Sequence, residues 1–482
     1  MRAPTCLFLS RPGRSWRGQA LAGVCAAAAL ALAGCQSGVA AKALAKPGVA
    51  PAGVVTVTAD PHVKTLADCL DLTPALCYGV RQFLTAYGIE PLLSRGIDGR
   101  GQNVVLIELV PSQTYSATTS NIRDDLAVFD GLFGLPAARL QVITRFAGAS
   151  TPYLTGAEEA MDAEMVHAVA PAATIRIILL PQGTGNLSTN DTRFIDALQL
   201  APSLGDIVSI TAGVSEHCAS SSGVATLTSA LRYDADRHVT VVASSGDNGA
   251  AGGPCSGAQP VPVRAVNLPA SDPLVLAAGG TTLEANHATG AYLGETAWNQ
   301  PAPRLPAGAP TPPASVQAEA LPTASNGGFS SLFPRPAYQN GVQGIGQTRG
   351  VPDVSADAGD LTGMAIAFSL APGNVVTTAD GTSAASPFWA GIVALADQYA
   401  GHALGFINPA IYRIGRSSRY HSAFHDITVG SNTVTYSGRT VTGYQAAPGW
   451  DPVTGWGSPD AQVLVPLLAA ESAAIPGKTN AG

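Results

Sequence analysis

The chain alternates short, nearly continuous apolar runs with longer segments of helical periodicity. The apolar runs are rich in valine and isoleucine, which is typical of strands buried on both faces of a parallel sheet. They cover residues 103–109, 174–180, 206–212, 238–244 and 274–278. Helical patterns lie between or after them, at residues 157–169, 224–236 and 386–399. The alternation predicts an α/β fold with a doubly wound, mostly parallel sheet and helices on both faces.

The pattern predicts one large folded domain over residues 65–470. Before it, residues 35–64 are rich in Ala, Gly, Val and Pro and lack periodicity, which indicates a flexible tether. Within it, residues 301–325 are rich in Pro and Ala and indicate a surface loop. Residues 471–482 indicate a tail.

The composition permits a sizeable core and argues against nucleic acid as a partner. Apolar residues make up 46% of the chain, charged residues only 12%, and the formal net charge is −7. The only lysines are Lys42, Lys46, Lys64 and Lys478, so no basic stripe exists to neutralise a phosphate backbone.

The first 34 residues have the pattern of an export signal. Arg11, Arg14 and Arg17 precede a small-residue apolar run over residues 20–33. The string Leu-Ala-Gly-Cys that ends at Cys35 resembles the lipobox of bacterial lipoproteins, which implies lipid attachment at Cys35 and a location in the cell envelope, at the outer membrane or periplasmic face. The alternative is an ordinary signal peptide and an extracellular protein.

Four cysteines remain in the exported part of the chain: Cys69, Cys77, Cys218 and Cys255. An oxidising compartment favours two disulfides, and four cysteines allow three pairings. We favour Cys69 with Cys77 and Cys218 with Cys255, because each pair closes a local loop. Four free buried cysteines are the alternative.

A candidate nucleophile lies in the string Gly-Thr-Ser that ends at Ser383. This string precedes a helical pattern whose expected inward face is Phe388, Ile392, Leu395 and Tyr399. A helix N-terminus offers unpaired N–H groups and a positive dipole end to a developing oxyanion. A serine or threonine here could instead simply cap the helix.

Carboxylates are better candidates for the base than histidine. His167 is the best candidate among the histidines, because it lies close to a string that subtilases also carry. However, residues 103–111 lack the Asp-Thr-Gly strand end that would accompany it in a subtilase. Glu158 and Asp162, four residues apart, share one face of the predicted helix 157–169. They can act as a base and its orienting partner at acid pH, or merely complement the helix dipole.

Asp247 is a third candidate carboxyl, at the carboxyl end of a predicted strand. Such strand ends form the crevice of open α/β sheets. A protonated Asp there can donate a hydrogen bond to an oxyanion. The alternative is an Asx-turn in a glycine-rich bend.

These elements together resemble the sedolisin family of serine-carboxyl peptidases, over about residues 72–467. The matching motifs are Glu-x-x-x-Asp at Glu158, Ser-Gly-Asp-Asn-Gly around Asp247, and Gly-Thr-Ser at Ser383. The resemblance implies a subtilisin-like fold and a triad of Ser383, Glu158 and Asp162, with Asp247 at the oxyanion. Asp380 departs from the glycine usual before Gly-Thr-Ser.

The resemblance also implies a site for one Ca²⁺ ion near the end of the chain. The carboxylates of Asp426 and Asp451 and the backbone carbonyls of Ile427, Ala447 and Gly449 would be its ligands. Such an oxygen-only set suits Ca²⁺. Turn formation by the two aspartates is the alternative.

We therefore expect an exported, lipid-anchored, monomeric endopeptidase that acts on proteins or peptides at acid pH through an acyl-enzyme. One rival is a catalytically silent binding lipoprotein on the same fold. The other rival is a neutral-pH subtilase with an unassigned histidine base.

Overall fold

The computed structural model describes residues 77–110, 120–146, 154–181, 191–255, 261–301, 322–360, 362–370, 373–436 and 438–473. The expected signal peptide, the tether, Cys35 and Cys69 lie outside these ranges, and so do residues 302–321 of the expected loop and residues 474–482 of the expected tail. The expectations for these parts stay predictions.

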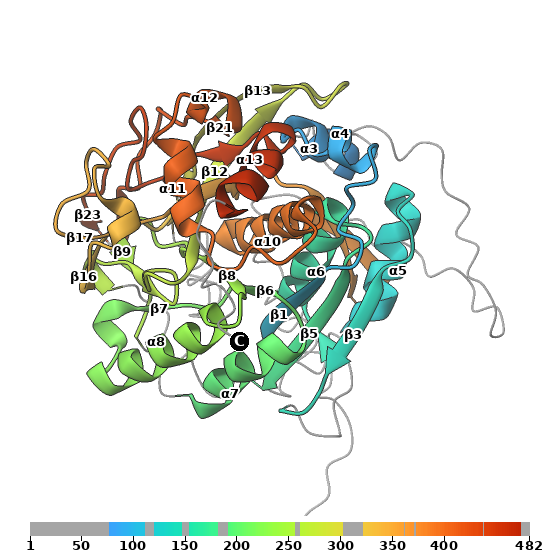
Figure 1. Cartoon of the computed structure of the whole chain (residues 1–482), viewed down its shortest axis with the longest axis horizontal. Coiled ribbons are helices and arrows are strands. Elements are labelled where there is room, and N and C mark those ends of the chain that lie inside the picture. The colour runs from blue at the N-terminus through green and yellow to red at the C-terminus, as the bar shows by residue number, and fades with distance from the viewer. Residues whose placement is uncertain are drawn as a thin grey trace, which may run out of the picture.

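A mostly parallel sheet of eight strands forms the centre of the molecule (Figure 1). Its strands are β1 (Asn103–Val110), β3 (Arg139–Ile143), β5 (Thr174–Pro181), β6 (Ile207–Ile210), β8 (Thr240–Ser244), β12 (Leu276–Ala285), β13 (Tyr292–Ala297) and β18 (Val354–Asp357). They are ordered β13-β12-β8-β6-β1-β5-β3, and β18 pairs with β12. Within this sheet only β13 runs antiparallel to its neighbour. The predicted fold class is confirmed.

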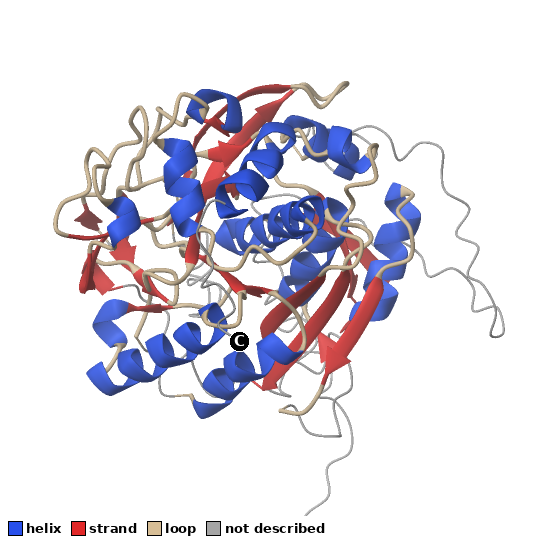
Figure 2. Ribbon diagram, viewed as in Figure 1, coloured by secondary structure: helices blue, strands red, loops and turns tan. Residues whose placement is uncertain are grey.

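Helices cover both faces of the sheet (Figure 2). They are α3 (Val80–Ala86), α4 (Glu90–Leu93), α5 (Ile122–Phe133), α6 (Ala157–Val169), α7 (Thr192–Leu200), α8 (Ser221–Ala235), α10 (Gly381–Ala400), α11 (Asn408–Gly415), α12 (Tyr420–Ala423) and α13 (Ala461–Ala473). In Figure 1, α6 and α10 lie above β6 and β8, and α7 and α8 lie below them. No helix of the described ranges is long and apolar enough to cross a membrane.

Alternate residues of the central strands enter two separate cores. In β1, Val104 and Leu106 join the core beneath α6 and α10, whereas Val105 and Ile107 join the core beneath α7 and α8. Burial on both faces explains why these strands read as continuous apolar runs. The same alternation turns the next residue of β1, Glu108, towards α6.

Short two-stranded ladders surround the sheet. They pair β2 (Ser120–Asn121) with β4 (Leu154–Thr155), β7 (Val214–Ser215) with β11 (Asn267–Leu268), β9 (Ala251–Gly252) with β10 (Val261–Arg264), β14 (Asn299–Gln300) with β15 (Thr323–Ala324), β16 (Gly328–Pro334) with β17 (Thr348–Val351), β19 (Ala365–Leu370) with β20 (Gly373–Thr378), β21 (Phe424–His425) with β24 (Ser458–Pro459), and β22 (Val434–Tyr436) with β23 (Arg439–Val441). Strand β15 falls inside the range expected as a loop.

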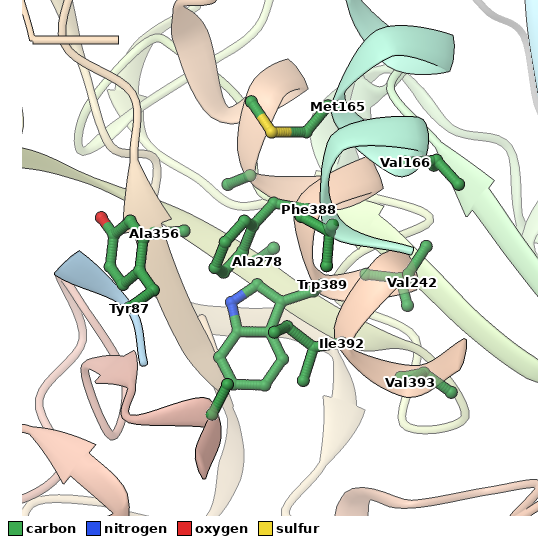
Figure 3. Close-up of a cluster of buried hydrophobic side chains, with 14 of the residues drawn as sticks. Tyr87, Met165, Val166, Val242, Ala278, Ala356, Phe388, Trp389, Ile392 and Val393 are labelled. Carbon is green, nitrogen blue, oxygen red and sulfur yellow. The ribbon is translucent and has the colours of Figure 1, made fainter. Parts of the chain in front are cut away.

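Most residues of helix α10 are buried. Its Phe388, Trp389 and Ile392 point into the core, where Phe388 packs against Tyr87 (Figure 3). The prediction that Tyr399 belongs to the inward face is wrong. Tyr399 is 45% exposed, because it lies in the last turn of α10, which ends at Ala400.

A buried ion pair fixes the segment before β18. Arg349 and Asp353 are fully buried, with Nη2 of Arg349 2.6 Å from Oδ2 of Asp353. The same carboxylate accepts the N–H of Ala277 at 2.8 Å and the hydroxyl of Tyr412 at 2.7 Å. It therefore ties β18 to β12 and α11.

The strand order reverses at β1, which lies between β5 and β6. In an open α/β sheet, the crevice at such a switch point, outside the carboxyl ends of the strands, is the usual binding site. Glu108, Thr211 and Asp247 lie at or just beyond the carboxyl ends of β1, β6 and β8.

Candidate active site

Ser383 lies in the first turn of α10. Gly381 opens this helix with φ +74°, a conformation that favours glycine. The N–H of Gly381 donates to the Ala358 carbonyl at 2.9 Å, and the N–H of Thr382 donates to Oδ1 of Asp247 at 2.9 Å. Ser383 is the third residue of α10, and the first four N–H groups of a helix have no partner one turn back, which leaves its N–H available to an oxyanion.

Helix α6 carries the predicted pair of carboxylates and has the predicted bounds. Glu159 accepts the N–H of Gly156 at 2.5 Å, which closes the first turn of the helix. One position earlier, Glu158 remains exposed, whereas Asp162, one turn further along, is fully buried. The two carboxylates thus lie on one face at different depths.

The carboxyl group of Glu158 lies close enough to the hydroxyls of Ser383 and Thr211 for both to lower its pKa. Although part of Glu158 faces solvent, protein atoms surround its carboxyl group. This burial raises the pKa of Glu158, the neighbouring Asp247 adds to the rise, and the bonds from Ser383 and Thr211 oppose it. The structure therefore brings the predicted nucleophile and the predicted base together.

Asp162 shares its buried space with Glu108, a residue that our sequence analysis did not identify. Burial raises the pKa of both, and the neighbouring Glu108 adds to the rise for Asp162. Two carboxyl groups that share a buried space favour a state in which one of them is protonated. The available signal was a single charged residue within the apolar strand β1.

Asp247 lies in the loop after β8 and is hydrogen-bonded to Thr382, the residue before Ser383. Burial raises its pKa, and the hydrogen bonds from Thr382 oppose the rise. The loop is fastened by the amide of Asn267, which donates to the Ser245 carbonyl at 3.0 Å, and by the N–H of Ala324, which donates to the Asp247 carbonyl at 2.9 Å. Asp247 is thus a half-buried carboxyl held rigidly beside the nucleophile.

Histidine takes no part in this arrangement among the described residues. His167, the candidate favoured by its position, is fully buried at the end of α6. Its Nε2 lies 2.9 Å from Oδ1 of Asp130 and 2.9 Å from the Pro136 carbonyl. These contacts join α5 to α6, so His167 stabilises the packing of these two helices.

The predicted calcium ligands come together in the loops that follow β21 and precede β24. The N–H of Gly449 donates to Oδ1 of Asp426 at 3.1 Å, and the N–H of Ala447 donates to Oδ2 of Asp451 at 3.2 Å. Burial raises the pKa of Asp451 to about 6. Among the described residues, no N–H or hydroxyl donates to the carbonyls of Ile427, Ala447 or Gly449.

This set fits a hard cation that takes oxygen ligands. The described residues contain no cluster of three or more His, Cys, Asp or Glu side chains able to hold a metal. An ion here would therefore rely on backbone carbonyls as much as on carboxylates.

Cys218 and Cys255 form a disulfide, with a sequence separation of 37 residues. This pairing is confirmed. The pairing of Cys77 with Cys69 stays a prediction, because Cys69 lies outside the described residues.

The model of the family described as "Subtilase family" matches residues 148–410, which carry Glu158, Asp162, Asp247 and Ser383. The chain belongs to the subtilase family. The match covers more than half of the chain and includes both helices, α6 and α10, that bring the carboxylates and the serine together.

Within the subtilase family, the chain is similar to serine-carboxyl peptidases. It is 33% identical over 402 residues to kumamolisin from Bacillus sp. (strain MN-32), covering 79% of this chain and 62% of that protein. It is 36% identical over 195 residues to sedolisin from Pseudomonas sp. (strain 101), covering 40% of this chain and 29% of that protein. The chain therefore spans less than two thirds of the length of these relatives.

A solved structure extends the similarity to the fold. Pseudomonas sedolisin, a serine-carboxyl proteinase complexed with two molecules of pseudo-iodotyrostatin, matches with a TM-score of 0.65 and 26% identity. The match covers 83% of this chain and 99% of that one. These similarities support the resemblance to the sedolisin family that the motifs indicate.

The buried carboxyl of Glu108 should make this subtilase less stable as the pH rises. Because burial raises its pKa in the folded state, the stabilisation is fully present below the unfolded pKa of about 4.3 and is lost as the pH rises through the folded pKa. Glu108→Gln should therefore flatten the fall in unfolding free energy between about pH 4 and pH 8, as measured by urea denaturation.

Asp397→Asn is the matched control for Glu108→Gln. Burial raises the pKa of Asp397 to about 8, and its Oδ1 accepts the N–H of Leu404 at 2.9 Å, near the far end of α10. This control should flatten the same curve without changing peptide hydrolysis, whereas Glu108→Gln should also change the pH dependence of kcat/KM. Identical pH slopes for the wild type and Glu108→Gln would contradict the assignment.

Proposed function

We propose that the chain is an endopeptidase of the serine-carboxyl type, which hydrolyses peptide bonds of proteins or peptides at acid pH. The observation that carries this proposal is the position of Ser383 beside the carboxyl group of Glu158, with Asp162 one helical turn behind. A serine hydroxyl beside a carboxylate, which a second acid orients, has the parts of an activated nucleophile.

In the first half of the reaction, Oγ of Ser383 attacks the carbonyl carbon of the scissile bond and transfers its proton to Glu158. The negative charge moves to the carbonyl oxygen, which accepts hydrogen bonds from the N–H of Ser383 and from protonated Asp247. Glu158 then gives its proton to the departing amine, and the acyl group remains on Ser383.

In the second half, water attacks the acyl-enzyme and Glu158 accepts the proton of that water. The same two donors stabilise the second oxyanion. Its collapse breaks the bond to Oγ of Ser383, Glu158 returns the proton to Oγ, and the acid product is released. Asp162 and Glu108 hold Glu158 in orientation through both halves.

The burial of these acids supports an acid optimum. Glu158 has to be ionised while Asp247 stays protonated. Burial raises the pKa of both, so Glu158 ionises at a higher pH and Asp247 stays protonated to a higher pH than ordinary carboxyl groups do. A histidine base would favour a neutral optimum instead.

Each single substitution in the triad should abolish turnover to a similar extent. Because the triad acts as a unit, Ser383→Ala and Glu158→Gln should each lower kcat by about a thousandfold or more. Digestion of a peptide library across about pH 3 to 8 measures activity and acid preference together. The matched control is Glu164→Gln, on the same helix, where Oε2 of Glu164 accepts the N–H of Ala367 at 2.8 Å away from Ser383.

Two outcomes would contradict this function. Absence of cleavage and of any acyl-enzyme on Ser383 across the whole pH range would favour a silent binding protein. An optimum near pH 8, with loss of activity in a folded histidine variant, would favour a neutral-pH subtilase.

We also propose that one Ca²⁺ ion supports the fold, held by Asp426, Asp451 and the carbonyls of Ile427, Ala447 and Gly449. The support is a pair of carboxylates and three carbonyls that accept no described donor. Ca²⁺ would supply the positive charge that offsets the crowding of these oxygens.

Calcium should raise the melting temperature of the wild type, because a ligand that binds only the folded state stabilises it. At about 100 times its Kd, the gain is about 2.7 kcal/mol. Asp426→Asn keeps an acceptor for Gly449 but removes a ligand charge, so it should lose most of this response. Equal melting temperatures of the wild type in calcium and in chelator would rule out the site.

Export and lipid attachment at Cys35 complete the proposal. They rest on the basic residues, the short apolar run and the lipobox-like string alone. Cys35→Ala should release the protein from membranes, whereas Cys6→Ala should not, as measured by fractionation. An intact mass with an unmodified Cys35 would contradict lipid attachment.

A further inference from the structure

Thr382 connects the first turn of α10 to the loop after β8 that carries Asp247. Its hydroxyl accepts the N–H of Gly246 at 2.9 Å and donates to Oδ1 of Asp247 at 2.7 Å. Its backbone N–H donates to the same oxygen at 2.9 Å. Because Gly246 donates to the hydroxyl oxygen, the hydroxyl proton is left to point at Asp247.

The two bonds from Thr382 make the oxygens of Asp247 unequal. A carboxyl oxygen has two lone pairs, and the two donors occupy both of those on Oδ1. None of the described residues donates to Oδ2. A proton on Asp247 therefore belongs on Oδ2, since a proton on Oδ1 would displace one of the donors.

Oδ2 of Asp247 lies next to the backbone of the first turn of α10. Oδ2 faces Gly381, where a side-chain Cβ would lie only 2.9 Å from it. Gly381 is two residues before Ser383, whose N–H is the other expected donor to the oxyanion. The missing side chain of Gly381 thus leaves room on the side of Asp247 that carries the proton.

We propose that Thr382 is a positioning residue that keeps the proton of Asp247 on Oδ2 and aims it at the oxyanion formed next to Ser383. This inference rests on the proposed peptidase function. Thr382 is only 1% exposed, so water does not readily replace its hydroxyl. The backbone N–H alone would leave one lone pair of Oδ1 open to the proton.

The same two bonds also set the charge of Asp247. Donors on a carboxylate favour its ionised form, whereas burial favours the neutral form. Removing the hydroxyl would leave burial less opposed, and the pKa of Asp247 would rise further. A variant without the hydroxyl should therefore be slower but remain active to higher pH.

Thr382→Val tests this proposal, because it replaces the hydroxyl with a methyl group of similar size. We expect kcat to fall about tenfold or more, within the range for a weakened oxyanion donor, with KM nearly unchanged. We also expect the alkaline limb of the kcat profile to move to higher pH. Thr382→Ser restores the hydroxyl and should recover most of the lost kcat and the original limb.

A double-mutant cycle separates positioning from folding. Thr382→Val leaves the N–H of Gly246 without its acceptor, so some loss of stability is expected. In the Asp247→Ala background, Thr382→Val should cause little further loss of kcat, because the group that it positions is already gone. Circular dichroism and thermal melting identify variants that fail to fold. If Thr382→Val fails to fold, Thr382→Ser is the variant that is compared with the wild type.

Three results would overturn the inference. The first is a kcat profile of Thr382→Val whose alkaline limb stays at the wild-type pH. The second is a kcat of Thr382→Ser as low as that of Thr382→Val. The third is a double mutant in which the losses of kcat from Asp247→Ala and Thr382→Val add. Each leaves the peptidase function standing, because wild-type cleavage through Ser383 is measured in the same assay. Inactive wild type would instead overturn the proposed function itself.

Discussion

The cost of charging a carboxyl group away from water is the constraint on which this site depends. Burial raises the pKa of Glu108, Asp162 and Asp247, and their partners are hydroxyls, amides or other carboxyls. The ion pair of Asp353 with Arg349 shows the opposite solution, in which a guanidinium neutralises a buried carboxylate that only holds the fold together. A site acid paired in that way would be ionised at every working pH. The site therefore depends on neutral donors.

The sheet brings these acids together without exposing its core. Because β1 alternates between two cores, it turns Glu108 towards α6 while its neighbours stay buried on both sides. Helix α6 adds Asp162 and Glu158 on one face, and α10 adds Ser383 at the end of the longest buried helix in the described chain. The reversal of strand order at β1 places the ends of β6 and β8 beside them, so five separate segments converge in one crevice.

Local sequence signals predicted the parts of the site that lie on regular elements. The bounds of α6 and the shared face of Glu158 and Asp162 follow from helical periodicity, and the position of Ser383 follows from a motif at a helix start. Glu108 and Thr211 could not be found in this way, because their role depends on strands that are distant in sequence but adjacent in the sheet. Tyr399 was misplaced for a related reason: periodicity fixes the direction of a side chain but not where the covering core ends.

The three acids behind Ser383 are also graded by depth, and this gradient constrains how protons move. Glu158 lies next to the nucleophile and is the one of these three with a partly exposed side chain. Asp162 and Glu108 are buried, and any charge that they acquire faces the full cost of desolvation. A negative charge is thus held most easily at the solvent end of the row, where the reaction needs it. The depth of each carboxyl, set by its place on α6 or β1, determines which of them is suited to act as the base.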